Sequence, residues 1–153
     1  MTVSRPRLSG LHHLKIPVSD LEESLNWFER VFAGVRNPAY DHFDRDGHRF
    51  AVVLDLPGFA SMVELRLAPR YAKDLRGFDP IIFSAPTRAD LVAWQQHLDS
   101  LGIDNSGIIY GIVGWTLIWH SPDGLSVRIY SDEEHEVDME GADIHNPWLQ
   151  YPG

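Results

Sequence analysis

Apolar residues recur along this chain in two copies of one pattern, each an alternating segment followed by a segment with helical spacing. The first copy, LHHLKIPVSDLEESLNWFERVFAG, covers residues 11–34, and the second, DPIIFSAPTRADLVAWQQHLDSLGI, covers residues 79–103. Alternation of apolar and polar residues predicts a β-strand, and apolar residues three or four apart predict the buried face of a helix. The predicted helices start about 67 residues apart, so the chain is expected to contain a duplicated module.

The first module begins with a predicted strand at residues 11–18 and a predicted helix at residues 19–32. Ser19 or Asp20, each with glutamate three residues later, has the spacing of a capping box, and Gly34 is typical of the position after a helix end. Alternating segments bounded by turn residues then predict three more strands. These strands are expected at residues 40–43, 48–56 and 61–67.

The second module repeats this order with a helix at residues 87–101, which starts at Thr87 or Arg88 and ends at Gly102. Its later strands are expected at residues 106–110, 115–120 and 125–130, with the strong turn sequence SPDG before the last. The predicted order is therefore βαβββ twice, an α+β fold. The expected boundaries are a lead-in at 1–10, modules at 11–68 and 79–131, a connection at 69–78 and an acidic tail at 132–153.

Composition limits the possible functions of these modules. The 153 residues contain no cysteine, which excludes disulfides, thiolate catalysis and cysteine-ligated metals. The net charge is −9, but seven of the 22 acidic residues fall within residues 132–143, which leaves 15 against 13 lysines and arginines. The modules therefore lack the basic surface of a nucleic-acid-binding protein. No apolar run approaches the ~20 residues of a membrane span, so no membrane association and a cytoplasmic location are expected.

The acidic tail ends in the sequence HNPWLQYPG, which carries two large aromatic residues. Two interpretations remain open at this point. The tail is either mobile, or an arm that packs onto a neighbouring molecule through Trp148 and Tyr151.

Two motifs, HLKIPVSDLEESLNWFERVF near the start and SPDGLSVRIY near the end, carry a resemblance to a known family. With the double βαβββ order, they make residues 11–131 resemble the vicinal oxygen chelate superfamily, which includes glyoxalases, bleomycin resistance proteins and extradiol dioxygenases. The resemblance implies that the two modules form a cup-shaped, eight-stranded mixed sheet with the helices outside. It also implies a small-molecule ligand in the cup and a homodimer.

The resemblance further implies four metal-ligand positions, which in this chain are His13, Glu64, Pro80 and Arg128. Proline has no side-chain donor atom, and the guanidinium of arginine stays cationic. Because a divalent ion needs three or four protein ligands, the metal site is expected to be vestigial. No cofactor is therefore expected, with a divalent metal as the alternative.

Strand alternation identifies the residues that would line the cup. The residues expected on the face toward the helices are Leu14, Ile16, Val63, Leu65, Leu67, Ile81, Phe83, Val127 and Ile129. The opposite faces carry His13, Lys15, Glu64, Arg66, Ile82, Ser84, Ser126, Arg128 and Tyr130. From this set, His13 and Glu64 are the candidate catalytic residues. The candidate ligand-binding residues are Lys15, Arg66, Ser84, Trp115, Trp119, Arg128 and Tyr130.

Several of these assignments have a structural alternative. Arg128 would either replace the lost metal and pair with Glu64, or point to solvent at a strand end. His13 would act as a base or ligand, or be a hydrogen-bonded remnant of an ancestral site. Trp115 and Trp119 would stack on a flat ligand or, more commonly for such aromatics, pack in the core.

Two functions are consistent with these residues. The first is a protein that binds a small, planar, anionic molecule without a conventional metal site. The alternative is an enzyme of lyase, isomerase or dioxygenase type that uses His13 and Glu64 with no metal or an atypical one. Three other histidines, His42, His48 and His120, show no ligand spacing in the sequence.

Overall fold

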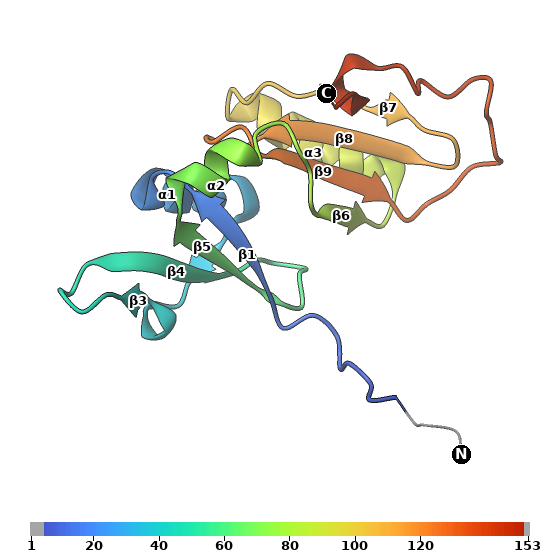
Figure 1. Cartoon of the computed structure of the whole chain (residues 1–153). Helices are drawn as coiled ribbons and strands as arrows, with labels where there is room; N and C mark the ends of the chain where they lie inside the picture. The colour runs from blue at the N-terminus through green and yellow to red at the C-terminus, as the bar shows by residue number, and fades with distance from the viewer. Residues whose placement is uncertain (1–4, 152–153) are drawn as a thin grey trace.

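The computed structural model describes residues 5–151 and contains two modules, each with its own sheet (Figure 1). In the first module the strand order is β1-β5-β4-β2, with β3 also paired to β4; β1 and β5 are parallel and the other pairs are antiparallel. Its elements are β1 (His13–Val18), α1 (Leu21–Phe32), β2 (Val35–Arg36), a 3-10 turn (Pro38–Tyr40), β3 (His42–Phe43), β4 (Arg49–Asp55) and β5 (Met62–Leu67).

The second module has the strand order β6-β9-β8-β7, with β6 parallel to β9 and the other pairs antiparallel. Its elements are β6 (Ile82–Ala85), α3 (Arg88–Ser100), β7 (Ile109–Tyr110), β8 (Trp115–His120) and β9 (Ser126–Ser131). The predicted α+β fold of two βαβββ modules is confirmed. The described strands number nine rather than eight, because β2 and β3 both follow α1, and they form two sheets rather than one.

The helices begin largely where the capping signals predicted. Asp20 accepts a hydrogen bond from the backbone N–H of Glu23 (2.9 Å), and Thr87 forms a capping box with Asp90. Ser19, the other candidate cap, instead donates its hydroxyl to the carboxylate of Asp123, in the turn before β9. This contact ties the start of α1 to the second module.

The end of α1 differs from the prediction at Gly34. Ala33 takes the left-handed conformation (φ 53°), although glycine adopts it with less strain. Gly34 is needed for another reason, because an added Cβ atom would lie 3.1 Å from the side chain of Leu56. Close packing between the helix end and the chain after β4 therefore favours glycine at this position.

The connection between the modules contains a short helix, α2 (Pro69–Asp74), that the sequence interpretation left as irregular chain. Pro69 occupies its first turn, where the missing N–H of proline is tolerated. Ala72 is buried in the otherwise exposed segment. A six-residue helix with a single buried position has too little periodicity to be recognised from sequence.

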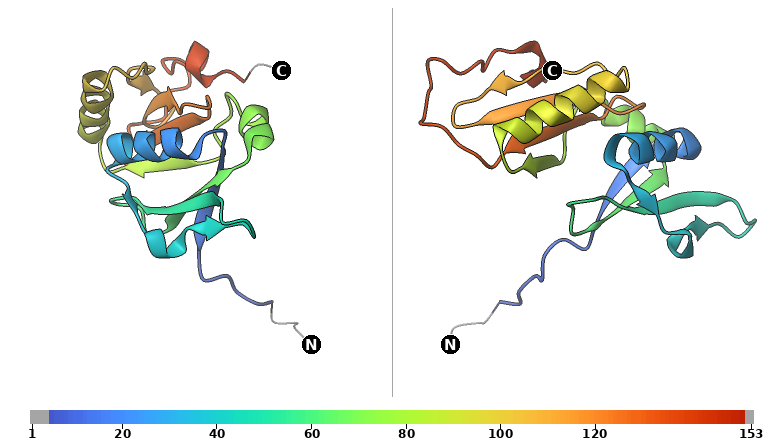
Figure 2. Two further views of the ribbon diagram at one scale, coloured as in Figure 1. Left: turned by 90° about the vertical axis from the view of Figure 1, so that its left-hand side faces the viewer. Right: turned by 180° about the vertical axis from the view of Figure 1, so that it is seen from behind.

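One apolar core joins the two modules. Leu21, Leu25 and Phe28 of α1 are buried, as are Leu91 and Leu98 of α3, so the predicted helix stripes are confirmed. The ring of Phe32 lies 5.7 Å from that of Phe83, 5.6 Å from Trp94 and 6.0 Å from Trp119, all in the second module. Figure 2 shows α1 between the two sheets and α3 along one face of the second. Within residues 5–151, no helix is long and apolar enough to cross a bilayer.

The acidic tail packs onto its own chain. His120 and Arg128 alternate with Trp119 and Ile129, which lie in the core beneath α3, so they occupy the opposite face of the second sheet. Trp148 stacks on His120 with ring centroids 5.0 Å apart. The hydroxyl of Tyr151 contacts both Asp79 and Arg128. The expected arm therefore exists, but the second module of the same chain receives it (Figures 1 and 2).

Candidate functional site

A buried carboxylate surrounded by basic side chains marks the open face of the first sheet. Glu64 is only 3% exposed. The Nε of Arg66 lies 2.6 Å from its Oε1, and His13 Nε2 and Lys15 Nζ lie 3.5 and 3.9 Å from its Oε2. His42 Nδ1 lies 4.0 Å from Oε1. Three of the predicted site residues thus gather around the fourth, Glu64.

Strand register brings these side chains together. Val63 and Leu65, on either side of Glu64, are fully buried in the core with α1, so alternation turns Glu64 to the other face. The parallel pairing of β1 with β5 sets Lys15 opposite Glu64 and His13 opposite Met62. The sheet supports this arrangement rigidly, because β5 has neighbours on both sides.

Arg66 links the carboxylate to the third strand. Its Nε donates to Glu64, and its Nη2 lies 3.2 Å from His42 Nδ1. Because a guanidinium has only donors, His42 Nδ1 is the acceptor, and a neutral His42 carries its proton on Nε2. The guanidinium also lies over the ring of Phe50, 4.9 Å from the centroid, in cation–π geometry.

An ion pair holds the segment that carries His42 against the sheet. The carboxylate of Asp41, 2% exposed, bonds to Arg36 and lies 3.4 Å from Arg49 Nη1. The hydrogen bond from the Arg36 guanidinium lowers the pKa of Asp41, so the carboxylate stays ionised. Tyr40 and His42, on either side of Asp41, are thereby positioned beside Glu64.

A cavity of about 330 Å³ opens directly at this cluster. Its size lies at the lower end of the range for small-molecule sites. Lys15 and Arg66, which contact Glu64 beside this cavity, carry two positive charges against the single carboxylate, so the site suits an anion. The lining residues are His12, His13, Tyr40, His42, Val53, Met62 and Glu64.

The sequence interpretation missed His42 and Tyr40 because they follow α1 in a short, irregular segment. No spacing in the sequence relates His42 to Glu64; only the pairing of β3 with β4 and of β4 with β5 brings them together. The weak signal available was a histidine in an alternating segment of the same module.

The structure places Arg128 away from Glu64. Its Nε lies 2.6 Å from Asp79 Oδ2, and its Nη2 donates to Tyr151. The hypothesis that Arg128 pairs with Glu64 is therefore wrong within the chain, because Asp79, just before β6, provides a nearer carboxylate. The Arg128 side chain is 13% exposed, so the solvent-facing alternative is also wrong.

The predicted aromatic residues also lie apart from Glu64. Trp119 is fully buried and stacks on Trp94 with centroids 5.9 Å apart, which favours the core-packing alternative. Trp115 packs edge-on against His135 of the tail, with centroids 4.9 Å apart. Tyr130 lies against Gly111 and Gly114, where an added Cβ atom would meet its side chain.

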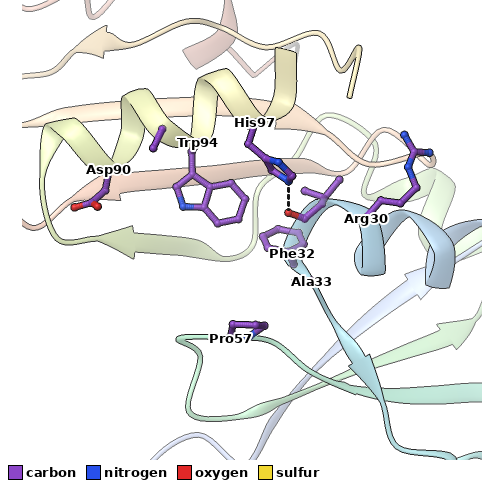
Figure 3. Close-up of a pocket in the computed structure, with 9 residues that line it drawn as sticks. Arg30, Phe32, Ala33, Pro57, Asp90, Trp94 and His97 are labelled. Atoms are coloured by element: carbon purple, nitrogen blue, oxygen red, sulfur yellow. Dashed lines mark hydrogen bonds between the residues drawn. The ribbon is translucent and has the colours of Figure 1, made fainter. Parts of the chain in front are cut away.

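Two further cavities lie between the modules. Ser84 lines one of about 690 Å³, whose walls include Phe59 and Phe83. The other, of about 400 Å³, lies between the end of α1 and α3 (Figure 3). There His97 Nε2 donates to the backbone oxygen of Val31 (3.0 Å), beside Trp94. Neither cavity has the concentration of charged groups found at Glu64.

Register also tests the vestigial metal positions. Lys15 and Ile82 hold corresponding positions in the two copies. Lys15 pairs with Glu64 on the first sheet, and Ile82 pairs with Arg128 on the second. Glu64 and Arg128 are therefore equivalent in the duplicated modules. His13, at the start of β1, and Pro80, just before β6, lie two residues before Lys15 and Ile82 and are then equivalent too. Only His13 and Glu64 of these four offer metal donors, and Arg66 already donates to Glu64. This set does not fit a conventional divalent metal site.

Asp44, Asp46 and His48 form a separate, exposed group in the turn between β3 and β4. One oxygen of Asp44 accepts from the backbone N–H groups of Asp46 and His48, both at 2.9 Å. Turn formation accounts for the position of this aspartate.

The sequence model of the Glyoxalase/Bleomycin resistance protein/Dioxygenase superfamily matches residues 10–109. That span is most of the chain and contains the first module, α3 and the start of β7. The chain belongs to this superfamily, as the two motifs indicated. None of the curated proteins compared by sequence matches the chain.

Solved structures share the fold at low sequence identity. A glyoxylase/bleomycin resistance protein/dioxygenase domain from Frankia sp. EAN1pec has a TM-score of 0.65 at 22% identity, with 82% of this chain and 98% of that chain covered. TnmS3, an antibiotic binding protein from Streptomyces sp. CB03234, has a TM-score of 0.66 at 18% identity, with 83% and 98% covered.

A third similar structure contains a metal. FosX, a fosfomycin resistance protein from Listeria monocytogenes complexed with Mn(II) and sulfate, has a TM-score of 0.61 at 14% identity, with 82% and 93% covered. At these identities the likeness concerns the fold. Proteins of this fold thus include one solved with Mn(II) and one described as an antibiotic binding protein.

Proposed function

We propose that this protein binds a small, planar, anionic molecule on the open face of the first sheet, without a conventional metal centre. The observation that carries the proposal is the buried Glu64 carboxylate with Lys15, Arg66, His13 and His42 within 4.0 Å, beside a cavity of about 330 Å³. Buried charges of this kind are expensive unless paired. An excess of basic groups around one acid therefore points to an anionic ligand.

Each residue around Glu64 has a role in the proposed binding. Glu64 holds Arg66 in place, and Lys15, whose side chain is half exposed, is free to turn toward a ligand carboxylate. Val53 and Met62 supply the apolar wall for a flat body. TnmS3 offers a precedent for this fold, as an antibiotic binding protein.

The second candidate is an acid–base enzyme without a metal, favoured by the 3.5 Å separation of His13 Nε2 and Glu64 Oε2. In that enzyme His13 would take a proton from a bound substrate and return it. Arg66 and Lys15 would stabilise the negative charge that develops. Turnover of a bound compound separates this function from simple binding.

The anion-binding role is tested by replacing Arg66 with methionine, which keeps most of the stem and removes the charge. A charge-assisted hydrogen bond contributes about 1.5–3 kcal/mol, so binding of benzoate is expected to weaken roughly 10- to 150-fold. Isothermal titration calorimetry provides the measurement. Benzamide, the neutral analogue, should bind more weakly than benzoate to the unmodified protein.

Arg70→Met is the matched control, because Arg70 is exposed on α2, away from the cavity. It should leave benzoate affinity unchanged. Thermal shifts with Mn²⁺, Zn²⁺ and Ni²⁺ belong to the same experiment, since a ligand of the folded state raises the Tm. A large shift with one metal and none with benzoate would contradict the proposal.

We further propose that the protein is a homodimer. β1 and β6 are edge strands of their sheets, and Leu11 and Ile82 nearby are more than half exposed. Exposed edges of this kind favour pairing with another chain, and a second copy provides matching edges under twofold symmetry. Light scattering should give twice the chain mass of 17.4 kDa at micromolar concentration. A mass of one chain would contradict the dimer.

A further inference from the structure

A second buried ion pair lies on the open face of the other module. Asp79 precedes β6 and Arg128 lies in the middle of β9, with Oδ2 and Nε 2.6 Å apart. Their side chains are 1% and 13% exposed. Because Arg128 is the register equivalent of Glu64, the two modules carry charged centres at corresponding places.

The pair holds the phenol group of Tyr151. The hydroxyl of Tyr151 donates to Asp79 Oδ1 and accepts from Arg128 Nη2 at 3.3 Å. Its ring packs against Phe78, with centroids 5.6 Å apart. A phenol group has a hydroxyl that both donates and accepts, and a flat ring. Asp79 accepts from the hydroxyl, Arg128 donates to it, and Phe78 packs against the ring.

The pair also keeps hydrogen-bonding capacity that the chain does not use. Asp79 Oδ2 and Arg128 Nε are buried and contact each other as an ion pair, but among residues 5–151 neither atom has a contact with hydrogen-bond geometry. A buried polar atom without a partner is costly in a structure that serves stability alone. An ion pair that keeps unused hydrogen-bonding capacity beside a bound hydroxyl is consistent with a site that receives a polar ligand.

The end of the tail, residues 144–151, is anchored to the second module by the side chains of Trp148 and Tyr151. Earlier in the tail, His135, Asp138 and Asp143 donate backbone hydrogen bonds to residues 110–113. Tyr151 is 54% exposed, and Val137, Met139 and Ile144 in the same tail are exposed apolar residues. Near the site, the stack of Trp148 on His120 is the other aromatic anchor. The tail thus covers the second sheet while burying little of its own apolar surface.

We propose that the Asp79–Arg128 pair is a binding site for hydroxylated aromatic compounds, and that Tyr151 is its built-in occupant. A phenolic ligand binds when the end of the tail leaves, with its hydroxyl donating to Asp79 and accepting from Arg128. This site is separate from the Glu64 cluster and does not depend on the function proposed there.

The test uses 4-methylphenol, which reproduces the tyrosine side chain, and the full-length Tyr151→Ala variant. Titration calorimetry should show a Kd of about 1 mM for a ligand this small. The unmodified protein should bind at least tenfold more weakly, because Tyr151 competes intramolecularly. 4-Methylanisole, which cannot donate a hydrogen bond, should bind the variant at least tenfold more weakly than 4-methylphenol.

Two further variants distinguish a binding site at the Asp79–Arg128 pair from a contact of Tyr151 that only anchors the tail. Adding Arg128→Met to Tyr151→Ala should abolish 4-methylphenol binding. Trp148→Ala, which removes the other anchor and keeps the site intact, should strengthen binding to a chain that retains Tyr151. Equal binding of 4-methylphenol and 4-methylanisole, or no binding to either single variant, would overturn the proposal and leave Tyr151 as a tether. Benzoate binding through Arg66 would be unaffected by either result.

Discussion

Asp79→Ala is expected to lower the free energy of unfolding by about 3–5 kcal/mol, because it removes one partner of a buried ion pair. Arg128 would remain with its side chain 13% exposed and without the carboxylate at 2.6 Å. The phenol of Tyr151 would also lose its acceptor. Urea unfolding followed by tryptophan fluorescence measures the change.

The exposed Asp55 provides the control for this prediction. Asp55→Ala should change stability by no more than about 0.5 kcal/mol. The double variant Asp79→Leu/Arg128→Met should be less destabilised than Asp79→Ala, since no buried charge is left alone. A single variant as stable as the control would show that the pair is hydrated in solution and that the charge of Arg128 is solvated.

The fold was largely predictable because the duplicated pattern is strong. Helices with four apolar residues on one stripe and recognisable caps were located to within a residue or two, and alternation identified the buried faces of β5 and β9. Alternation failed at Leu67, which was assigned to the inner face and is 43% exposed. It ends its strand, beyond the reach of α1, and alternation alone cannot show where the covering helix stops.

The tail illustrates a different limit. Its acidity and its two aromatic residues showed that it differs from the modules, and they suggested an arm. The surface that receives it is a matter of tertiary structure. Asp79 and Tyr151 are 72 residues apart, and their contact depends on where β6 begins and where the tail crosses the second sheet.

Only part of the candidate site could be predicted, because alternation assigns a side chain to a face of the sheet and not to a partner. His13, Lys15, Glu64 and Arg66 follow from the alternation within two strands that the resemblance pairs. The partner of Arg128 did not follow, because Asp79 lies in irregular chain before β6, where alternation gives no side-chain direction. Charged residues on opposite strands can be assigned to a face from sequence, but a specific pair depends on distances that only the structure supplies.

Trp119 provides the second large effect. Trp119→Ala is expected to lower the free energy of unfolding by about 3–5 kcal/mol, the usual range for removing a buried tryptophan. The side chain is fully buried and contacts Phe32 of the first module and Trp94 of α3, so the cavity would open where the modules join. Differential scanning calorimetry should show a lower Tm in one transition.

The same position tests whether Trp119 serves packing alone. Its indole Nε1 is buried and, among residues 5–151, has no hydrogen-bond partner, and a buried donor in that state costs about 1–3 kcal/mol. Trp119→Phe should therefore destabilise much less than Trp119→Ala, because it removes the unpaired donor and keeps a ring against Trp94. Tyr71→Ala, at a 64% exposed aromatic on α2, should be nearly neutral. If Trp119→Phe instead kept full stability and abolished benzoate binding, Trp119 would contact the ligand after all, and its assignment to the core would be wrong.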